Sequence, residues 1–274
     1  MLLVLGRVSN VPTVWSNCLA AWLLGGGGPW PRFACLCFGA TALYIAGMFL
    51  NDAFDADFDR QFRPERPIPA GLIQARTVWT AGLGLLMLGW GMLWPLGGMP
   101  FGVGAALAVC IVLYDAIHKQ TLLAPILMAA CRLLLYILAG CSAQGGFNRI
   151  LIASGLAVAI YICGISYLAR GESVQGAAPP WAVGLLFAPS IVGLTVRDVR
   201  SSFLLASAIQ VAWVIWCLRG AWARPKRHLS DGVAGLLAGI VLVDMLAAPS
   251  FALPVAFLAL FCLALLLQRV APAT

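Results

Sequence analysis

Charged residues are scarce in this chain. Only 10% of the 274 residues are Asp, Glu, Lys or Arg, whereas 62% are hydrophobic and the mean hydropathy is +0.96. A soluble domain carries about 25% charged residues, so the composition excludes a water-soluble fold. Nine or ten membrane spans of about 20 residues would use almost the whole chain, which leaves no room for a soluble catalytic domain. Any chemistry must therefore take place at the ends or on the inner faces of transmembrane helices.

The nine cysteines lack the spacing of a metal site or a disulfide framework. All nine lie in apolar stretches, and the closest two, Cys35 and Cys37, have no histidine near them. We therefore expect buried thiols that behave as small apolar residues.

The apolar residues form stretches of about 15 to 22 residues, the length that a helix needs to cross a bilayer. They predict an all-α, polytopic transmembrane bundle of nine or ten helices, with residues 1–274 in a single domain. The predicted spans are 12–25, 33–53, 77–94, 101–116, 122–141, 150–169, 178–195, 201–219, 232–247 and 250–269. The last two are separated only by Ala248, Pro249 and Ser250, so they form either a tight hairpin or one kinked segment.

Basic residues are distributed unequally between the two sides of this predicted bundle. When the loops are assigned alternately, the side of the N-terminus has twelve Lys and Arg residues and the other side has four, while Arg132 lies mid-helix. By the positive-inside rule, the loops after the even-numbered spans face the cytoplasm from the inner or plasma membrane. The net charge of +7 thus indicates orientation, and we expect no nucleic-acid partner.

Half of the ten acidic residues lie between positions 52 and 65, at the end of the second predicted span. Asp52, Asp55 and Asp59 have the spacing i, i+3, i+7, which places them on one helix face. Asn51 lies on the same face, and Asp57 points away from it. Neighbouring carboxylates at a membrane boundary are costly, and Mg²⁺ with phosphate oxygens would remove the cost. The cluster predicts a metal–phosphate site, with a solvated helix end as the alternative.

Prolines interrupt any helix after this cluster. The segment RPERPIP, residues 63–69, should be a stiff loop that holds Arg63 and Arg66 next to the carboxylates. Guanidinium groups suit diphosphate oxygens because they donate hydrogen bonds in parallel pairs. Anchoring the chain on the positive side of the membrane is a second role for both arginines, and the two roles are compatible.

The next loop on the same side has the sequence YDAIHK and contains Tyr114, Asp115 and Lys119. Asp115 and Lys119 have the spacing i, i+4, so they either pair with each other or leave Lys119 to meet a phosphate. We include all three in the predicted substrate site.

One cation lies near the middle of a predicted span. Arg132 needs a partner or a polar cavity there, because a lone charge inside a bilayer is costly, and it is therefore a candidate substrate-binding residue. Asp244, deep in the span 232–247, is its possible counter-ion. A structural buried pair explains the two residues equally well.

These residues together resemble the UbiA superfamily of intramembrane prenyltransferases. The resemblance covers the whole chain by helix number and polarity, and its core is a long and specific motif. The residues that carry it are Arg7, Asn10 and Asn17, then Asn51-Asp52-x-x-Asp55-x-x-x-Asp59, Arg66-Pro67-Ile68-Pro69-x-Gly71, and Tyr114 with Lys119.

The resemblance implies a bundle around a central, lipid-facing cavity and Mg²⁺-dependent transfer of a prenyl group from its diphosphate to an aromatic or other lipophilic acceptor. By position, Asp52, Asp55 and Asp59 would hold Mg²⁺, with Asn51 supporting them. Arg66 and Lys119 would contact the diphosphate. The metal and the cations would stabilise the departing charge, and a dry cavity would protect the allylic cation from water.

The second aspartate motif of the family, D-x-x-x-D after the sixth span, has no counterpart. The sequence there is YLARGES, in which Glu172 is the only acid and Arg170 adds positive charge. Either one metal site survives and Arg170 neutralises phosphate directly, or the altered site binds another phosphate or transfers nothing. We assign Arg170 and Glu172 to the predicted substrate site.

An altered second motif beside an intact first one resembles a divergent branch of the superfamily, found in bacterial and algal gene clusters for secondary metabolites. A second hypothesis follows: a non-catalytic membrane protein that binds or helps to move a lipophilic secondary metabolite. A general secondary transporter has less support, because no convincing internal repeat is present.

Overall fold

Helices are the only regular elements in the described part of the chain. The computed structural model describes residues 2–173, 180–196, 200–223, 228–247 and 254–271. Two short 3₁₀ helices, η1 (Val8–Asn10) and η2 (Trp94–Leu96), accompany the α-helices. The α-helices are α1 (Leu2–Leu5), α2 (Val11–Leu24), α3 (Trp30–Phe54), α4 (Ala56–Phe62), α5 (Ala75–Gly91), α6 (Gly98–Ile117), α7 (Ala124–Ser142), α8 (Arg149–Ser173), α9 (Pro180–Leu185), α10 (Ala188–Val196), α11 (Ser201–Ala223), α12 (His228–Ala238), α13 (Ile240–Met245) and α14 (Pro254–Gln268).

In the described part of the chain, six helical segments are long and apolar enough to cross a membrane, so the chain is an integral membrane protein. They are Trp30–Phe54, Ala75–Leu96, Gly98–Ile117, Ala124–Ser142, Arg149–Arg170 and Ser201–Arg219, and they agree with six of the predicted spans. The other four predicted spans fall on shorter helices: 12–25 on α2, 178–195 on α9 and α10, 232–247 on α12 and α13, and 250–269 on α14. Residues 178–179 and 250–253 of these spans, and the predicted hairpin or kink at 248–250, lie outside the described residues. The all-α class is confirmed, whereas the number of nine or ten spans stays a prediction.

Proline and glycine explain where several of these helices begin or break. Prolines occupy the first turn of α2, α3 and α7, where a missing N–H costs nothing. Between α12 and α13, Gly239 allows Tyr161 of α8 to approach, because a Cβ at Gly239 would lie 2.8 Å from the tyrosine hydroxyl. That hydroxyl donates to the Leu236 carbonyl at 3.0 Å, so the predicted span 232–247 is interrupted by a contact from another helix.

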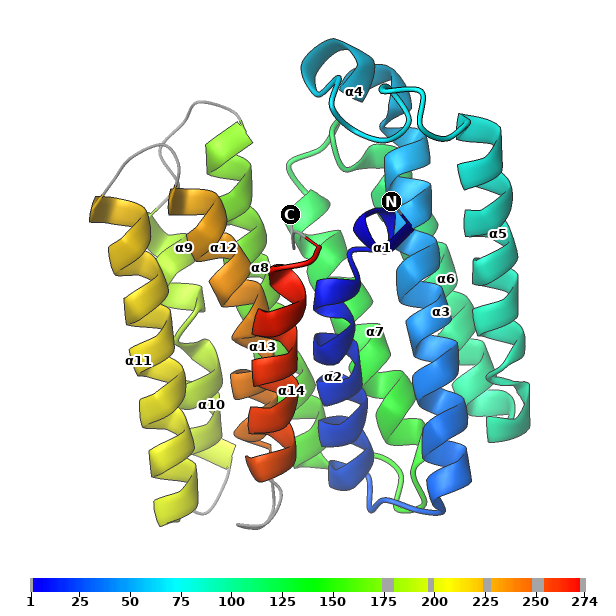
Figure 1. Cartoon of the computed structure of the whole chain (residues 1–274). Coiled ribbons are helices and arrows are strands. Elements are labelled where there is room, and N and C mark those ends of the chain that lie inside the picture. The colour runs from blue at the N-terminus through cyan, green and yellow to red at the C-terminus, as the bar shows by residue number, and fades with distance from the viewer. Residues whose placement is uncertain (1, 174–179, 197–199, 224–227, 248–253, 272–274) are drawn as a thin grey trace.

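The helices run roughly side by side, and α4 lies across one end of the bundle, next to the end of α3 (Figure 1). In the contacts between elements, α3 packs against α5, α2 and α6, and α7 packs against α8, α6 and α2. The α3–α5 contact is close because glycines face each other: a Cβ on Gly89 would lie 2.9 Å from the Gly39 carbonyl oxygen. Small residues let membrane helices approach in this way.

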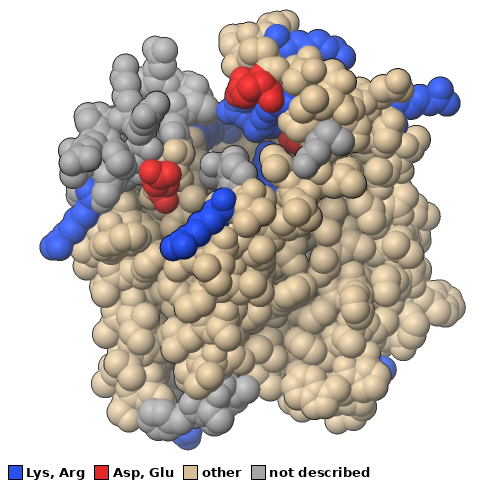
Figure 2. Space-filling view, in the orientation of Figure 1, with Lys and Arg blue, Asp and Glu red and all other residues tan. Residues whose placement is uncertain are grey.

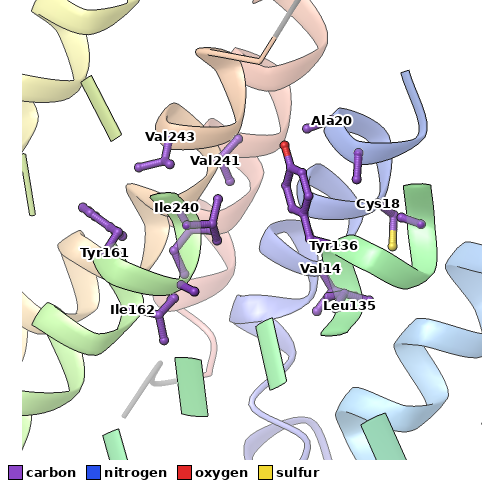
Figure 3. Packing of buried hydrophobic residues seen from close by; sticks show 14 of the residues in the cluster. Val14, Cys18, Ala20, Leu135, Tyr136, Tyr161, Ile162, Ile240, Val241 and Val243 are labelled. Carbon is purple, nitrogen blue, oxygen red and sulfur yellow. The ribbon is translucent and has the colours of Figure 1, made fainter. Parts of the chain in front are cut away.

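The largest buried hydrophobic cluster joins N-terminal and C-terminal helices of the bundle. It includes Val14 and Cys18 of α2, Tyr136 of α7, Tyr161 of α8 and Ile240 of α13, and Figure 3 shows these side chains between the helices. All nine cysteines are free thiols, as expected. Burial was expected for all of them, but only Cys18 and Cys217 are buried; six are half-buried, and Cys262, on α14, is exposed.

Large apolar side chains also cover the outside of the bundle, among them Met87, Leu205 and Trp216. The sides seen in Figure 2 are almost free of charge, and most of the visible charged residues lie at the end that carries α4. An apolar belt with charged ends is the surface that a bilayer requires.

Candidate functional site

The three predicted aspartates lie where α3 meets α4. Asp52 is in the last turn of α3, Asp55 is the junction residue, and Asp59 is in α4. The backbone stays nearly helical there, since the Asp55 N–H donates to the Asn51 carbonyl at 2.9 Å and the Asp59 N–H to the Asp55 carbonyl at 2.8 Å. The shared face expected from the spacing is thus preserved. Their exposed fractions are 8%, 5% and 1%, whereas the Asp57 side chain is 91% exposed and pairs with Arg60.

Arg66 joins two of the three carboxylates. Its Nη1 lies 3.0 Å from Asp52 Oδ1 and 3.2 Å from Asp59 Oδ2. Arg7, which precedes η1, adds a second guanidinium: its Nη2 lies 3.7 Å from Asp52 Oδ1 and donates to Asn51 Oδ1 at 3.4 Å. Burial of carboxylates is tolerable only with such partners, so these cations hold the acidic face in place.

The loop that presents Arg66 is ordered by turns, as its prolines predicted. The Ala70 N–H donates to the Arg66 carbonyl at 2.9 Å, and the Leu72 N–H to the Pro67 carbonyl at 3.0 Å. Gly71 has φ 74°, a conformation that favours glycine. The positive φ of this turn therefore explains why the R-P-I-P-x-G motif ends in glycine. Arg63 is half-buried at the end of α4, where its N–H donates to the Asp59 carbonyl at 2.8 Å.

Lys119 pairs with Asp55, and the predicted alternative of an i, i+4 pair with Asp115 is not made. Its Nζ lies 2.8 Å from Asp55 Oδ1 and 3.6 Å from the centroid of the Phe58 ring. The reason is that α6 ends at Ile117, so Lys119 is beyond the helix and can reach the neighbouring acidic face. His118 Nε2 lies 3.5 Å from Asp55 Oδ2.

These two basic neighbours also set the ionisation of Asp55. Burial by itself raises the pKa of a carboxyl group, but the hydrogen bonds from His118 and Lys119 outweigh burial and hold the pKa of Asp55 below its usual value. Asp55 is therefore an ionised carboxylate at neutral pH, available to a cation.

Asp115 lies on α6 beside the first motif and is 3% exposed. Its Oδ1 accepts a hydrogen bond from Asn51 Nδ2 at 3.2 Å, and its backbone carbonyl lies 3.1 Å from His118 Nδ1. Tyr114 stacks on the His118 ring, with centroids 5.1 Å apart. The structure thus brings Asn51, Tyr114 and Asp115 close to one another, through contacts that the sequence did not indicate.

The end of α8 contacts the segment that follows Lys119. Arg170 Nη1 donates to the Thr121 carbonyl at 2.6 Å, and the Tyr167 hydroxyl donates to the Leu122 carbonyl at 3.4 Å. Arg170 therefore lies next to the segment after Lys119, where it donates a hydrogen bond to a backbone carbonyl. Glu172 lies in α8, but its side chain falls outside the described part of the structure.

Arg132 belongs to a separate polar cluster, inside the bundle. It donates to Asn17 Oδ1 at 2.8 Å and to Thr13 Oγ1 at 3.0 Å. Asp244 accepts from Asn17 Nδ2 at 2.9 and 2.7 Å and from Ser16 Oγ at 2.5 Å. A direct pair of Arg132 with its possible counter-ion Asp244 is absent from the described ion pairs, because the Asn17 amide lies between them and offers an acceptor to one and donors to the other.

The carboxylates at the α3–α4 junction have the right chemistry for Mg²⁺, which prefers carboxylate oxygens. Asp59 Oδ1 and Asp115 Oδ2 are buried without a hydrogen-bond partner, so ligand capacity remains. In the described residues, no three His, Cys, Asp or Glu side chains converge closely enough to enclose a metal ion. Instead, Arg66 lies between Asp52 and Asp59 and pairs with both, and Lys119 pairs with Asp55.

Two residues of this site, His118 and Arg7, were not predicted as site residues from the sequence. His118 gave no signal beyond its position beside Lys119. Arg7 was noted only within the resemblance, and its structural mark is a left-handed backbone with φ 39°, unique among the described non-glycine residues. Strain of this kind is typical of functional positions.

Comparison with known proteins supports the resemblance to the UbiA superfamily across most of the chain. A model of the UbiA prenyltransferase family matches residues 9–272. A 4-hydroxybenzoate octaprenyltransferase from Herminiimonas arsenicoxydans is 36% identical over 88 residues, which are 31% of this chain and only 30% of that relative. A digeranylgeranylglyceryl phosphate synthase from Methanopyrus kandleri is 28% identical over 214 residues, or 74% of each chain.

Two solved structures have the same fold. One is the apo form of a UbiA homolog from Aeropyrum pernix K1, with a TM-score of 0.66 and 13% identity over 88% of this chain and 96% of that one. The other is a UbiA homolog from Archaeoglobus fulgidus bound to DMAPP and Mg²⁺, with a TM-score of 0.66 and 12% identity over 98% of this chain and 99% of that one. With the family model covering nearly the whole sequence, this chain belongs to the UbiA prenyltransferase family.

Proposed function

We propose that the protein is a Mg²⁺-dependent integral-membrane prenyltransferase that moves an isoprenoid chain from a prenyl diphosphate to an aromatic or other lipophilic acceptor. The observation that carries the proposal is the buried set of paired charges at the α3–α4 junction, where Arg66 bridges Asp52 and Asp59 and Lys119 pairs with Asp55. The relatives named as prenyl transferring enzymes and the neighbour bound to DMAPP and Mg²⁺ support it.

The proposed roles follow from exchange of charge partners. Asp52, Asp55 and Asp59 hold Mg²⁺, which when bound supplies positive charge to the diphosphate. Arg66 and Lys119, released from the carboxylates, donate hydrogen bonds to diphosphate oxygens and stabilise the charge that develops as the diphosphate leaves. The apolar interior of the bundle excludes water from the prenyl group while it carries positive charge. The site faces the cytoplasm, the side expected from the charge asymmetry.

Binding of a prenyl diphosphate tests this proposal without knowledge of the acceptor. We would titrate the protein in nanodiscs with geranyl thiodiphosphate, a slowly reacting analogue, with and without Mg²⁺. Binding that needs Mg²⁺ and is lost in Asp55→Ala is expected. The matched control is Asp57→Ala, because Asp57 belongs to the same segment but is exposed and points away. The proposal would be rejected if neither this analogue nor analogues with shorter and longer prenyl chains bind.

The second candidate is a non-catalytic protein that binds or helps to move a lipophilic metabolite. Arg170, bonded to the Thr121 carbonyl, favours it, since the family pattern has aspartates in that region. This candidate predicts that Asp55→Asn and Asp59→Asn keep cellular function in a complementation assay. Loss of complementation in variants that are folded and present at normal levels would argue strongly against it.

A further inference from the structure

Asp115 is a buried carboxylate that lacks the partners of the other acids in the site. Asp52, Asp55 and Asp59 each lie within 4.0 Å of a Lys or Arg nitrogen. Asp115 is in no ion pair of the described structure, and its Oδ2 is buried without a hydrogen-bond partner. Buried carboxylate oxygens are almost always satisfied, so this oxygen has the capacity to bind a cation.

The position of Asp115 links it to the first motif from a different helix. Asn51 Nδ2 donates to Asp115 Oδ1 at 3.2 Å, while Asn51 Oδ1 accepts from Arg7, which also contacts Asp52. On its other side, the His118 ring lies between the Asp115 backbone carbonyl and the Asp55 carboxylate. The Asp115 carboxylate is therefore hydrogen-bonded to the first motif through Asn51.

The charge of the cluster gives a reason for a fourth acid. The sequence from Tyr167 to Ser173 contains no aspartate, and the described end of α8 brings Arg170 to Thr121. With Arg7, Arg66 and Lys119 already balancing the three motif carboxylates, a divalent cation that binds before the diphosphate would add positive charge to a buried site. A fourth carboxylate without a basic partner compensates for part of that charge, and its oxygen is a ligand that Mg²⁺ accepts.

We propose that Asp115 is a carboxylate ligand of the divalent cation in this site and replaces the acids that the end of α8 lacks. The inference rests on the proposed function, since it requires that the site binds a metal with the diphosphate. It assigns to α6 a role that the family pattern gives to the segment after the sixth span.

Direct measurement of metal binding tests this role separately from catalysis. Mn²⁺ is a suitable probe, because its free and bound forms differ in electron paramagnetic resonance. The full-length protein in nanodiscs would be titrated with Mn²⁺ in the presence of geranyl thiodiphosphate. Asp115→Asn keeps the size and can keep a hydrogen bond to Asn51, but has no carboxylate. We expect its Mn²⁺ affinity to fall by at least about tenfold, and that of Asp115→Glu to fall less.

The outcomes separate failure of this inference from failure of the proposed function. Asp57→Asn is the matched control and should bind Mn²⁺ as the wild type does. If Asp55→Ala loses the site but Asp115→Asn and Asp115→Ala retain it unchanged, Asp115 is only structural and the inference is wrong. If the wild type binds no Mn²⁺, the metal-dependent function and the inference both fall. Thermal unfolding and gel filtration check the fold, and Asp115→Ala replaces Asp115→Asn if the latter does not fold.

Discussion

At the scale of single residues, the site is organised by the need to pair buried carboxylates. Asp52 and Asp59 share one guanidinium nitrogen of Arg66, at 3.0 and 3.2 Å. Such a pair contributes little net stability relative to apolar residues, but removing one partner leaves buried charge and is strongly destabilising. The cations therefore have a structural role whenever no other cation is bound, and that role makes a measurable prediction.

Arg66→Gln should destabilise the metal-free protein, because Asp52 and Asp59 then lose their shared cation. We expect a loss of about 1 to 3 kcal/mol in the free energy of unfolding. Added Mg²⁺ should restore part of this stability if it binds the same carboxylates. Thermal unfolding in detergent with and without Mg²⁺ measures both effects. Arg60→Gln is the control, since the exposed Arg60–Asp57 pair contributes only about 0 to 1 kcal/mol. Equal responses of the two variants would contradict the prediction.

Asp55 predicts a dependence on pH. Its pKa is lower in the folded state than the ordinary value of 3.8, because the hydrogen bonds from His118 and Lys119 outweigh burial. A lowered carboxyl pKa stabilises the folded state above the unfolded pKa, and this stability is lost as the pH falls through the folded value. The stability difference between wild type and Asp55→Asn in metal-free solution should thus be full at neutral pH and should shrink below about pH 4. A difference that grows on acidification would be inconsistent with this pairing.

At the scale of elements, close helix contacts position the acidic face. The contact of α3 with α5 depends on Gly39 and Gly89, and α3 carries Asp52 at its end. In the interior, Asn17 of α2 connects Arg132 of α7 to Asp244 of α13. Both arrangements bring together helices that are distant in sequence.

Gly89→Ala should weaken the α3–α5 contact. The added Cβ would lie 2.8 Å from the Leu43 backbone nitrogen and 2.9 Å from the Gly39 carbonyl oxygen, and backbone atoms cannot move away without moving the helix. Overpacking of this kind costs about 1 to 3 kcal/mol. Gly91→Ala, at the end of the same helix and with open space around it, should be neutral or slightly stabilising. Thermal unfolding of the two variants tests this prediction. Equal unfolding midpoints would mean that the α3–α5 contact is not tight.

At the scale of the whole molecule, the charged end that carries α4 contrasts with the uncharged sides (Figure 2). This distribution fits a bundle that crosses the membrane with the site at one surface. The basic residues of the chain favour placing that surface in the cytoplasm.

The orientation can be tested with two exposed positions near opposite ends of the bundle. Glu65→Cys lies in the loop after α4, and Met99→Cys lies at the start of α6. Starting from a variant without native cysteines, an impermeant maleimide added to intact cells should label only Met99→Cys. After lysis it should label both. Labelling of Glu65→Cys in intact cells would reverse the proposed orientation.

The sequence by itself determined the membrane class, six of the spans and the shared face of Asp52, Asp55 and Asp59. These follow from local properties, because the length of an apolar run and the spacing along a helix need no knowledge of distant residues. The stiff loop of Arg66 was predictable for the same reason, since proline restricts the backbone wherever it occurs.

Only the tertiary structure decided which charges meet. Lys119 pairs with Asp55 although Asp115 is nearer in sequence, and Asn17 separates Arg132 from Asp244. Tertiary packing also broke the predicted span 232–247 at Gly239, where Tyr161 approaches. The physical reason is common to all three: each contact joins residues far apart in the chain, and its geometry depends on how the helices pack against one another.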